Sequence, residues 1–139
     1  MVRNIAVFLL ALGLVSTGAK ADEAVTTQTL LQTTRTNIGQ PIRYPHGGVP
    51  EITTMIVTIP PGGATVLHRH PVPIVGYILE GQLEVRAAGG KVNRYKPGDT
   101  VIEAIGVAHR GVNVGRVPVR ILVTVIGVKG QAYAVPVKQ

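Results

Sequence analysis

Two histidines separated by one residue, His68 and His70, are the side chains whose spacing first suggests chemistry. Residues two apart in a β-strand share a face, so both imidazoles are expected to project together while Arg69 projects away. His109 lies on a later strand-like segment that a closed barrel could bring opposite the pair. Three imidazoles suit Zn, Cu, Fe or Ni and leave coordination positions open for water, oxygen or substrate. The alternative is that each is an ordinary polar surface residue.

The elements that must position these histidines are expected to be strands. Val and Ile dominate the apolar residues, the chain has no Trp, and its single Phe is Phe8. β-Branched residues favour strands, and Gly and Pro recur between the short apolar runs, which is typical of an all-β sandwich or barrel. The expected strands are Thr26–Thr36, Thr53–Ile59, Thr65–His70, Ile74–Leu79, Gln82–Ala87, Lys91–Tyr95, Thr100–Ala104, His109–Val114 and Val119–Val128.

Length and composition exclude several classes of protein. The 139 residues fit a single domain. The absence of Cys excludes a disulfide framework, a thiolate metal site and a cysteine nucleophile. The net charge is +7, but the basic residues are scattered along the chain without interleaved aromatic residues, so no nucleic-acid partner is expected.

The N-terminus has the organisation of a secretory signal peptide. Arg3 precedes an apolar run over Ile5–Val15, and Ala19-Lys20-Ala21 has the form of a signal-peptidase site. We expect residues 1–21 to be cleaved, leaving a domain over residues 22–139 that is secreted or periplasmic and has no stable membrane anchor. An uncleaved anchor or a core helix is the alternative interpretation.

Two motifs in the middle of the chain closely resemble those of the cupin family. The first runs from Gly62 through His68 and His70 to Gly81, and the second contains Gly98, Gly106, His109 and Asn113, with Ala104 where the family usually has Pro. The resemblance implies a single-domain jelly-roll barrel, a double-stranded β-helix, with a metal inside its mouth.

One departure from the first motif concerns the family's metal-binding Glu, whose place is taken by Ile74 or Val75. A neutral three-His site is therefore expected, which would leave both charges of a divalent metal available to an anionic ligand. Glu103, six residues before His109, is the candidate catalytic residue. It could orient a ligand imidazole, act as a base or become a fourth ligand; otherwise it is a solvated residue at the rim.

The remaining candidate residues have less specific roles. Ile74 is expected to form a dry wall of the site together with Val66 and Ile78. Tyr77 is expected on the outer face of its strand, and Asn113 is expected to be structural or to support a ligand. His46, Glu80 and Glu84 are expected to lie in solvent.

The three-His pattern resembles the acetylacetone-cleaving dioxygenases among the cupins. This implies a non-haem iron(II) dioxygenase acting on a small chelating substrate of enolate or diketone type, with Zn, Mn or Ni as alternative metals. A non-catalytic periplasmic metal or small-ligand binding protein, and a three-His Zn hydrolase or lyase, are the other hypotheses. The apolar run Val117–Val128 is expected to be buried on both faces, which favours a homodimer.

Overall fold

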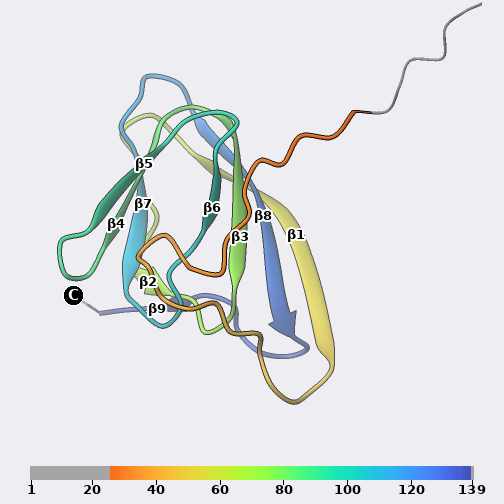
Figure 1. The fold of residues 1–139 in the computed structure, drawn as a ribbon. Coiled ribbons are helices and arrows are strands. Elements are labelled where there is room, and N and C mark those ends of the chain that lie inside the picture. Colours follow the sequence, from red (N-terminus) through yellow and green to blue (C-terminus); the bar gives the residue numbers. More distant parts are fainter. Residues whose placement is uncertain (1–25, 139) are drawn as a thin grey trace, which may run out of the picture.

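The structure is a computed structural model that describes residues 26–138, so the predicted signal peptide, residues 1–21, lies outside the described residues. Within residues 26–138 a pair of antiparallel sheets face each other (Figure 1). One sheet has the order β1 (Pro50–Ile59), β8 (Val119–Val128), β3 (Ile74–Glu80) and β6 (Thr100–Ile102). The other has the order β5 (Val92–Tyr95), β4 (Leu83–Ala87), β7 (His109–Asn113), β2 (His68–Arg69) and β9 (Val135–Pro136). This is the predicted all-β jelly roll.

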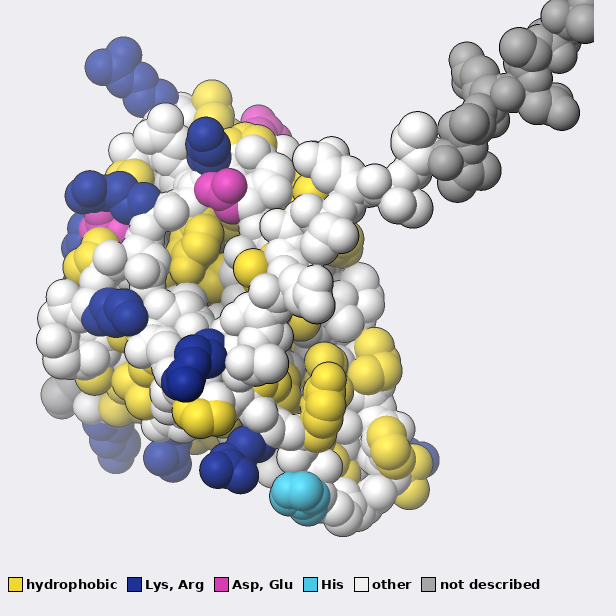
Figure 2. All heavy atoms as spheres, in the orientation of Figure 1, with side chains coloured by type: hydrophobic (Ala, Val, Ile, Leu, Met, Phe, Trp, Pro, Cys, Tyr) yellow, Lys and Arg dark blue, Asp and Glu magenta, His cyan; other side chains and the backbone are white. Residues whose placement is uncertain are grey.

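The core lies between the two sheets and follows from the alternation of side chains along each strand. In β8, Ile121 and Val123 point inward and are buried, whereas Leu122 points outward and is exposed. The predicted burial of Val117–Val128 on both faces is therefore wrong for the monomer. Figure 2 shows hydrophobic side chains at the surface in the region of β1 and β8, and Lys and Arg side chains dispersed over the same view.

Most predicted strands are present, but two differ from the prediction. Thr26–Thr36 contains no strand, and only Arg35 forms an isolated bridge, to Pro41. Residues 26–35 are exposed, so their β-branched threonines have no neighbouring side chains to pack against in a sheet. The predicted strand Thr65–His70 is reduced to β2, and the short β9 was not predicted. Residues 26–138 contain no helix that could span a membrane.

Gly81, which ends the first motif, turns the chain between β3 and β4. Its φ of 81° is unfavourable for residues with a Cβ, and a Cβ placed there would lie 2.6 Å from the carbonyl oxygen of Pro118. Gly62, Gly98 and Gly106 also have positive φ, as predicted for turn residues.

Candidate metal centre

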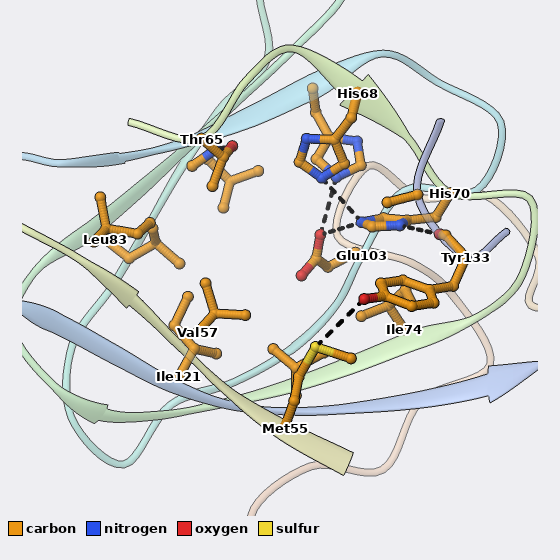
Figure 3. A pocket seen from close by; sticks show the side chains of 16 residues that line it. Met55, Val57, Thr65, His68, His70, Ile74, Leu83, Glu103, Ile121 and Tyr133 are labelled. Carbon is orange, nitrogen blue, oxygen red and sulfur yellow. Dashed lines mark hydrogen bonds and ion pairs between the residues drawn. The ribbon is translucent and has the colours of Figure 1, made fainter. Parts of the chain in front are cut away.

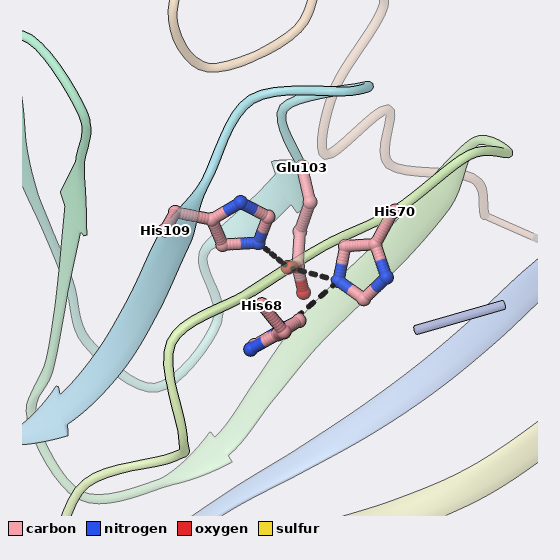
Figure 4. A group of neighbouring side chains, drawn as sticks. All are labelled: His68, His70, Glu103 and His109. Carbon is pink, nitrogen blue, oxygen red and sulfur yellow. Dashed lines mark hydrogen bonds and ion pairs between the residues drawn. The ribbon is translucent and has the colours of Figure 1, made fainter. Parts of the chain in front are cut away.

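Three histidines and one glutamate converge between the sheets (Figure 4). His68 in β2 lies directly opposite His109 in β7 in the antiparallel ladder. His70 follows β2 and Glu103 follows β6, so both sheets contribute to the cluster. One ligand atom from each of the four side chains lies within 4.8 Å of the others. The predicted convergence of the three imidazoles is therefore present.

Glu103 joins the three histidines in the cluster, which favours the predicted alternative of a fourth ligand over a neutral three-His site. Its Oε2 atom lies 2.9 Å from Nε2 of His109 and 3.1 Å from Nε2 of His70. Nε2 of His68 lies 3.2 Å from Nε2 of His70. The side chain replaces the carboxylate missing at Ile74, and it reaches the same centre from a different strand.

A backbone carbonyl fixes the tautomer of each imidazole. Nδ1 of His68 lies 2.7 Å from the carbonyl oxygen of Val66, and Nδ1 of His70 lies 2.6 Å from that of Tyr133. Nδ1 of His109 lies 2.9 Å from the carbonyl oxygen of Val107. A carbonyl oxygen only accepts hydrogen bonds, so Nδ1 carries the proton in all three rings. Each neutral ring then directs the lone pair of Nε2 toward the centre of the cluster.

This arrangement places hydrogen-bond acceptors, the Nε2 lone pairs and the Glu103 carboxylate, next to one another with no proton to bridge them. The Nε2 atoms of His68 and His70 face each other, and two Nε2 atoms face the Glu103 carboxylate. Such contacts are stabilised only if the rings gain a second proton or a cation lies among the four atoms. Donors about 2.1 Å from a metal, at right angles to one another, are about 3.0 Å apart. Three of the separations, 2.9 to 3.2 Å, match that spacing, and all four ligand atoms lie within 4.8 Å of one another, so the four residues fit a divalent transition metal.

The electrostatics of the metal-free cluster follow from the same contacts. Burial opposes ionisation of Glu103, but the hydrogen bonds that the His109 and His70 rings donate when they carry a second proton outweigh it and lower the pKa of the carboxyl to about 2. Burial opposes protonation of His109, yet the Glu103 carboxylate and the Val107 carbonyl together raise its pKa. Burial lowers the pKa of His68. Glu103 is therefore an anion at neutral pH.

A cavity of about 200 Å³ adjoins the cluster (Figure 3). His68, His70, Glu103 and Tyr133 lie toward one end, and the cavity continues between the sheets past Leu83 and Val57. The apolar side chains that line it are Met55, Val57, Ile59, Ile74, Leu83, Val85, Ile121, Val123 and Ala134. No Lys or Arg of residues 26–138 lines this cavity, so its positive charge would come from a bound metal or from protonated histidines.

Two contributors to the site were not predicted, because no local motif marks them. Tyr133, beyond the last long strand, provides the carbonyl that binds His70. Gln40 hydrogen-bonds both backbone groups of Ile105, at 2.9 and 3.0 Å, and so holds the segment between Glu103 and His109. Both contacts join residues more than 60 positions apart.

The other predicted residues have mixed outcomes. Ile74 lines the cavity as expected, but Val66 is 70% exposed and is not part of the wall. Ile78 is fully buried in the core beside the cavity rather than in its lining. Tyr77 is on the outer face, and His46 is exposed and outside the cluster.

Two polar residues on β7 and β4 have structural roles. The Asn113 amide donates to the carbonyls of Ile59 and Val117, so this residue ties strand ends together. The expectation that Glu84 lies in solvent is wrong: it is buried on the outer face of β4, where Arg86 and Arg94 donate hydrogen bonds to it. Its pKa is lowered by the hydrogen bond from Arg86, with a further contribution from Arg94.

Comparison with known proteins identifies the family. Residues 55–125 match the family described as "Cupin domain". The chain belongs to the cupin family. No curated protein matches the sequence.

Several solved cupin structures resemble this one. Oxalate decarboxylase from Lactobacillus farciminis, in a formate complex, is 25% identical with a TM-score of 0.55, over 62% of this chain and 26% of that chain. The DMSP lyase DddQ from Ruegeria pomeroyi is 28% identical with a TM-score of 0.54, over 61% of this chain and 42% of that one. The match thus spans less than half the length of either enzyme. An uncharacterized protein from Klebsiella pneumoniae with a double-stranded β-helix domain shares the fold at 22% identity, with a TM-score of 0.55, over 70% of this chain and 86% of that one.

Proposed function

We propose that this cupin is a metal-dependent enzyme that acts on a small chelating substrate with one anionic end and an apolar remainder. The observation that carries the proposal is the cluster of three Nε2 lone pairs and one carboxylate at the polar end of an otherwise apolar cavity. A divalent metal bound there would supply Lewis acidity toward a chelating pair of oxygens, and iron(II) would add redox chemistry with oxygen.

The charge of the cluster restricts the substrate. One carboxylate, that of Glu103, offsets one of the two charges of a divalent metal. A single negative charge on the ligand then balances the site, as in an enolate or a monocarboxylate. Within residues 26–138 no Lys or Arg lines the cavity, and its volume of about 200 Å³ is below the ~300–1,000 Å³ of pockets for drug-sized ligands. Dicarboxylates and large aromatic ligands are therefore disfavoured.

The position of Glu103 separates its possible roles. Its Oε2 atom lies 2.9 Å from Nε2 of His109 and 3.1 Å from Nε2 of His70, which is the spacing of donors that share a metal, and a carboxylate oxygen bound to a metal is a poor proton acceptor. The same ionised group is a good anionic ligand. We therefore assign Glu103 to ligation with His68, His70 and His109, and the substrate is expected to bind already deprotonated.

For the reaction itself we propose an oxygen-dependent cleavage by a non-haem iron(II) dioxygenase. The mixed imidazole and carboxylate donors suit iron. The apolar walls to which Ile74, Val57 and Ile121 contribute would limit the water inside the cavity and so protect reactive species.

A metal-dependent lyase is the second candidate, and it is favoured by the 28% identity to a structure named as a DMSP lyase. A lyase needs no oxygen, whereas a dioxygenase consumes it with its substrate. A protein that binds ligand but turns it over neither with nor without oxygen would be a non-catalytic ligand-binding protein.

The test begins with metal analysis of the purified protein. The iron(II)-loaded form is then mixed with acetylacetone, other short β-diketones and short aliphatic 2-oxo acids, and oxygen uptake and products are measured. The matched control is the His109→Ala variant treated in the same way. Substrate-dependent oxygen uptake by the wild type alone supports the dioxygenase. Turnover at the same rate under argon would replace it with the lyase.

A further inference from the structure

The chain after β8 turns back and returns to the metal site, where Tyr133 and Ala134 line the cavity. Residues 129–138, which we call the C-terminal strap, add β9 to the edge of β2. Pro136 lies opposite His68 and Val135 lies opposite Arg69, while the N–H of Val137 donates to the carbonyl of Leu67 at 2.9 Å. The strap is therefore paired directly with the strand that leads into two metal ligands, and it brings Tyr133 to the cavity (Figure 3).

The backbone of Tyr133 supports one ligand in a way that differs from the other two. His68 and His109 each donate Nδ1–H to a carbonyl two residues earlier in their own segment, Val66 and Val107. The acceptor for His70 is 63 residues away, in the strap, at 2.6 Å. The orientation and tautomer of His70 therefore depend on the strap being in place.

The side chain of Tyr133 faces the cavity with a weakly used hydrogen-bond donor. Its hydroxyl is directed toward Sδ of Met55 at 3.8 Å, and a thioether sulfur is a weak acceptor (Figure 3). Among residues 26–138, the one other hydroxyl that lines the cavity is that of Thr65, which accepts a hydrogen bond from the N–H of Gly111. An oxygen of a ligand would be a much better acceptor for the phenol than the sulfur of Met55.

We propose that Tyr133 is a positioning residue for His70 through its backbone carbonyl and a specificity-determining residue through its phenol, which donates a hydrogen bond to an oxygen of the metal-chelating substrate. The specificity role rests on the proposed function, because it requires a chelating ligand in the cavity. The positioning role requires only that the cluster binds a metal.

The positioning role is tested by the metal affinity of three forms of the protein. A chain ending at Gly130 lacks the carbonyl, whereas Tyr133→Ala and a chain ending at Pro136 retain it. Loss of such a supporting partner weakens metal binding by about 10–100-fold. We expect this loss, measured as the Co(II) dissociation constant in competition with a chromophoric chelator, only for the chain ending at Gly130. An unchanged constant in that variant would overturn the positioning role.

A measurement on the full chain covers the case in which the shortened chain does not fold. In the zinc-loaded protein, the Nδ1 proton of His70 is expected in the NMR spectrum as a slowly exchanging signal coupled across the hydrogen bond to the Tyr133 carbonyl carbon. A His70 ring protonated at Nε2, or coupled to another carbonyl, would overturn the positioning role without any variant.

The specificity role is tested with Tyr133→Phe, which removes only the hydroxyl. Acetylacetone is titrated into the Co(II)-loaded protein, and binding is followed by the visible absorption of the metal. A hydrogen bond to a charged acceptor predicts that Tyr133→Phe binds acetylacetone at least about tenfold more weakly, with an unchanged Co(II) dissociation constant. Tyr77→Phe, on the outer face of β3, is the matched control and is expected to behave as wild type. Equal binding by Tyr133→Phe and wild type would overturn the specificity role.

The two proposals fail in different ways. None of these measurements needs turnover, so a lack of oxygen consumption would refute the dioxygenase and leave the roles of Tyr133 standing. No binding of acetylacetone to the wild-type Co(II) protein would overturn both the specificity role and the chelating substrate class. The positioning role would still be decided by metal affinity and by the His70 signal.

Discussion

Replacing Glu103 by Gln removes the negative charge of the metal cluster while keeping its shape. In the metal-free protein, Glu103 lies 2.9 Å from His109 and 3.1 Å from His70, and its pKa is lowered from 4.5 to about 2. Each pKa unit corresponds to about 1.4 kcal/mol, so the carboxylate stabilises the fold by about 3 kcal/mol when its partners are protonated. Glu103→Gln is expected to lose about this amount near pH 5.5.

The direction of each pKa shift fixes the pH range of this effect. The contribution of Glu103, whose pKa is lowered, is present above pH 4.5 and is lost as the pH falls toward 2. The contribution of His109, whose pKa is raised, is present below pH 6.5 and is lost as the pH rises through the folded value. The contributions of Glu103 and His109 are therefore both present between about pH 4.5 and 6.5, whereas the lowered pKa of His68 opposes them as the pH falls below 6.5.

Urea unfolding in the presence of a chelator, at pH 2.5, 5.5 and 8.5, measures this profile. The difference between wild type and Glu103→Gln should be largest at pH 5.5. It should shrink at pH 8.5, because a Gln amide can donate to a neutral imidazole whereas a carboxylate cannot. Glu51→Gln, at an exposed position in β1, is the control. Parallel pH profiles for wild type and Glu103→Gln would refute the reasoning that the carboxylate is paired with protonated histidines.

Three further predictions concern the metal, the turn and the outer face. His109→Ala is expected to remove most of the bound metal, measured by elemental analysis, while circular dichroism still reports a folded barrel; unchanged metal content would exclude His109 as a ligand. Gly81→Ala is expected to lower the free energy of unfolding by about 2 kcal/mol or more, because φ is 81° and the added Cβ meets the Pro118 carbonyl; a loss below about 0.5 kcal/mol would contradict this. We also propose that the chain forms a homodimer through the outer face of β1 and β8, where Leu122 is exposed. Light scattering should then give twice the chain mass for the wild type and a smaller mass for Leu122→Lys, and a monomeric wild type would refute the dimer.

The sequence could predict that His68 and His70 act together, because the alternation of side chains along a strand determines which of them share a face. Strand alternation placed His68 and His70 on one face, and the structure confirms this. The positive φ of Gly81 and Gly106 was predictable in the same way, because their places in the motifs mark turns. Strands such as Val119–Val128 were predictable from their run of β-branched residues, with the same bounds in the structure.

The sequence pattern gave wrong predictions where tertiary burial, and not the intrinsic preference of the residues, determines the structure. Residues 26–36 contain several threonines, yet they form no strand, because no neighbouring strand offers them a partner. Glu84 has the sequence context of a solvated residue, but Arg86 and Arg94 come together over it only after β4 and β5 pair.

The sequence by itself determined an all-β cupin with three histidines on inward-facing strand positions. Only the tertiary structure decided that Glu103 joins them, since its contact with His70 spans 33 residues and crosses from one sheet to the other. The same holds for the carbonyl of Tyr133, which reaches His70 across 63 residues. Such contacts depend on how the two sheets pack and where the strap returns, and neither is encoded in the periodicity of any one segment.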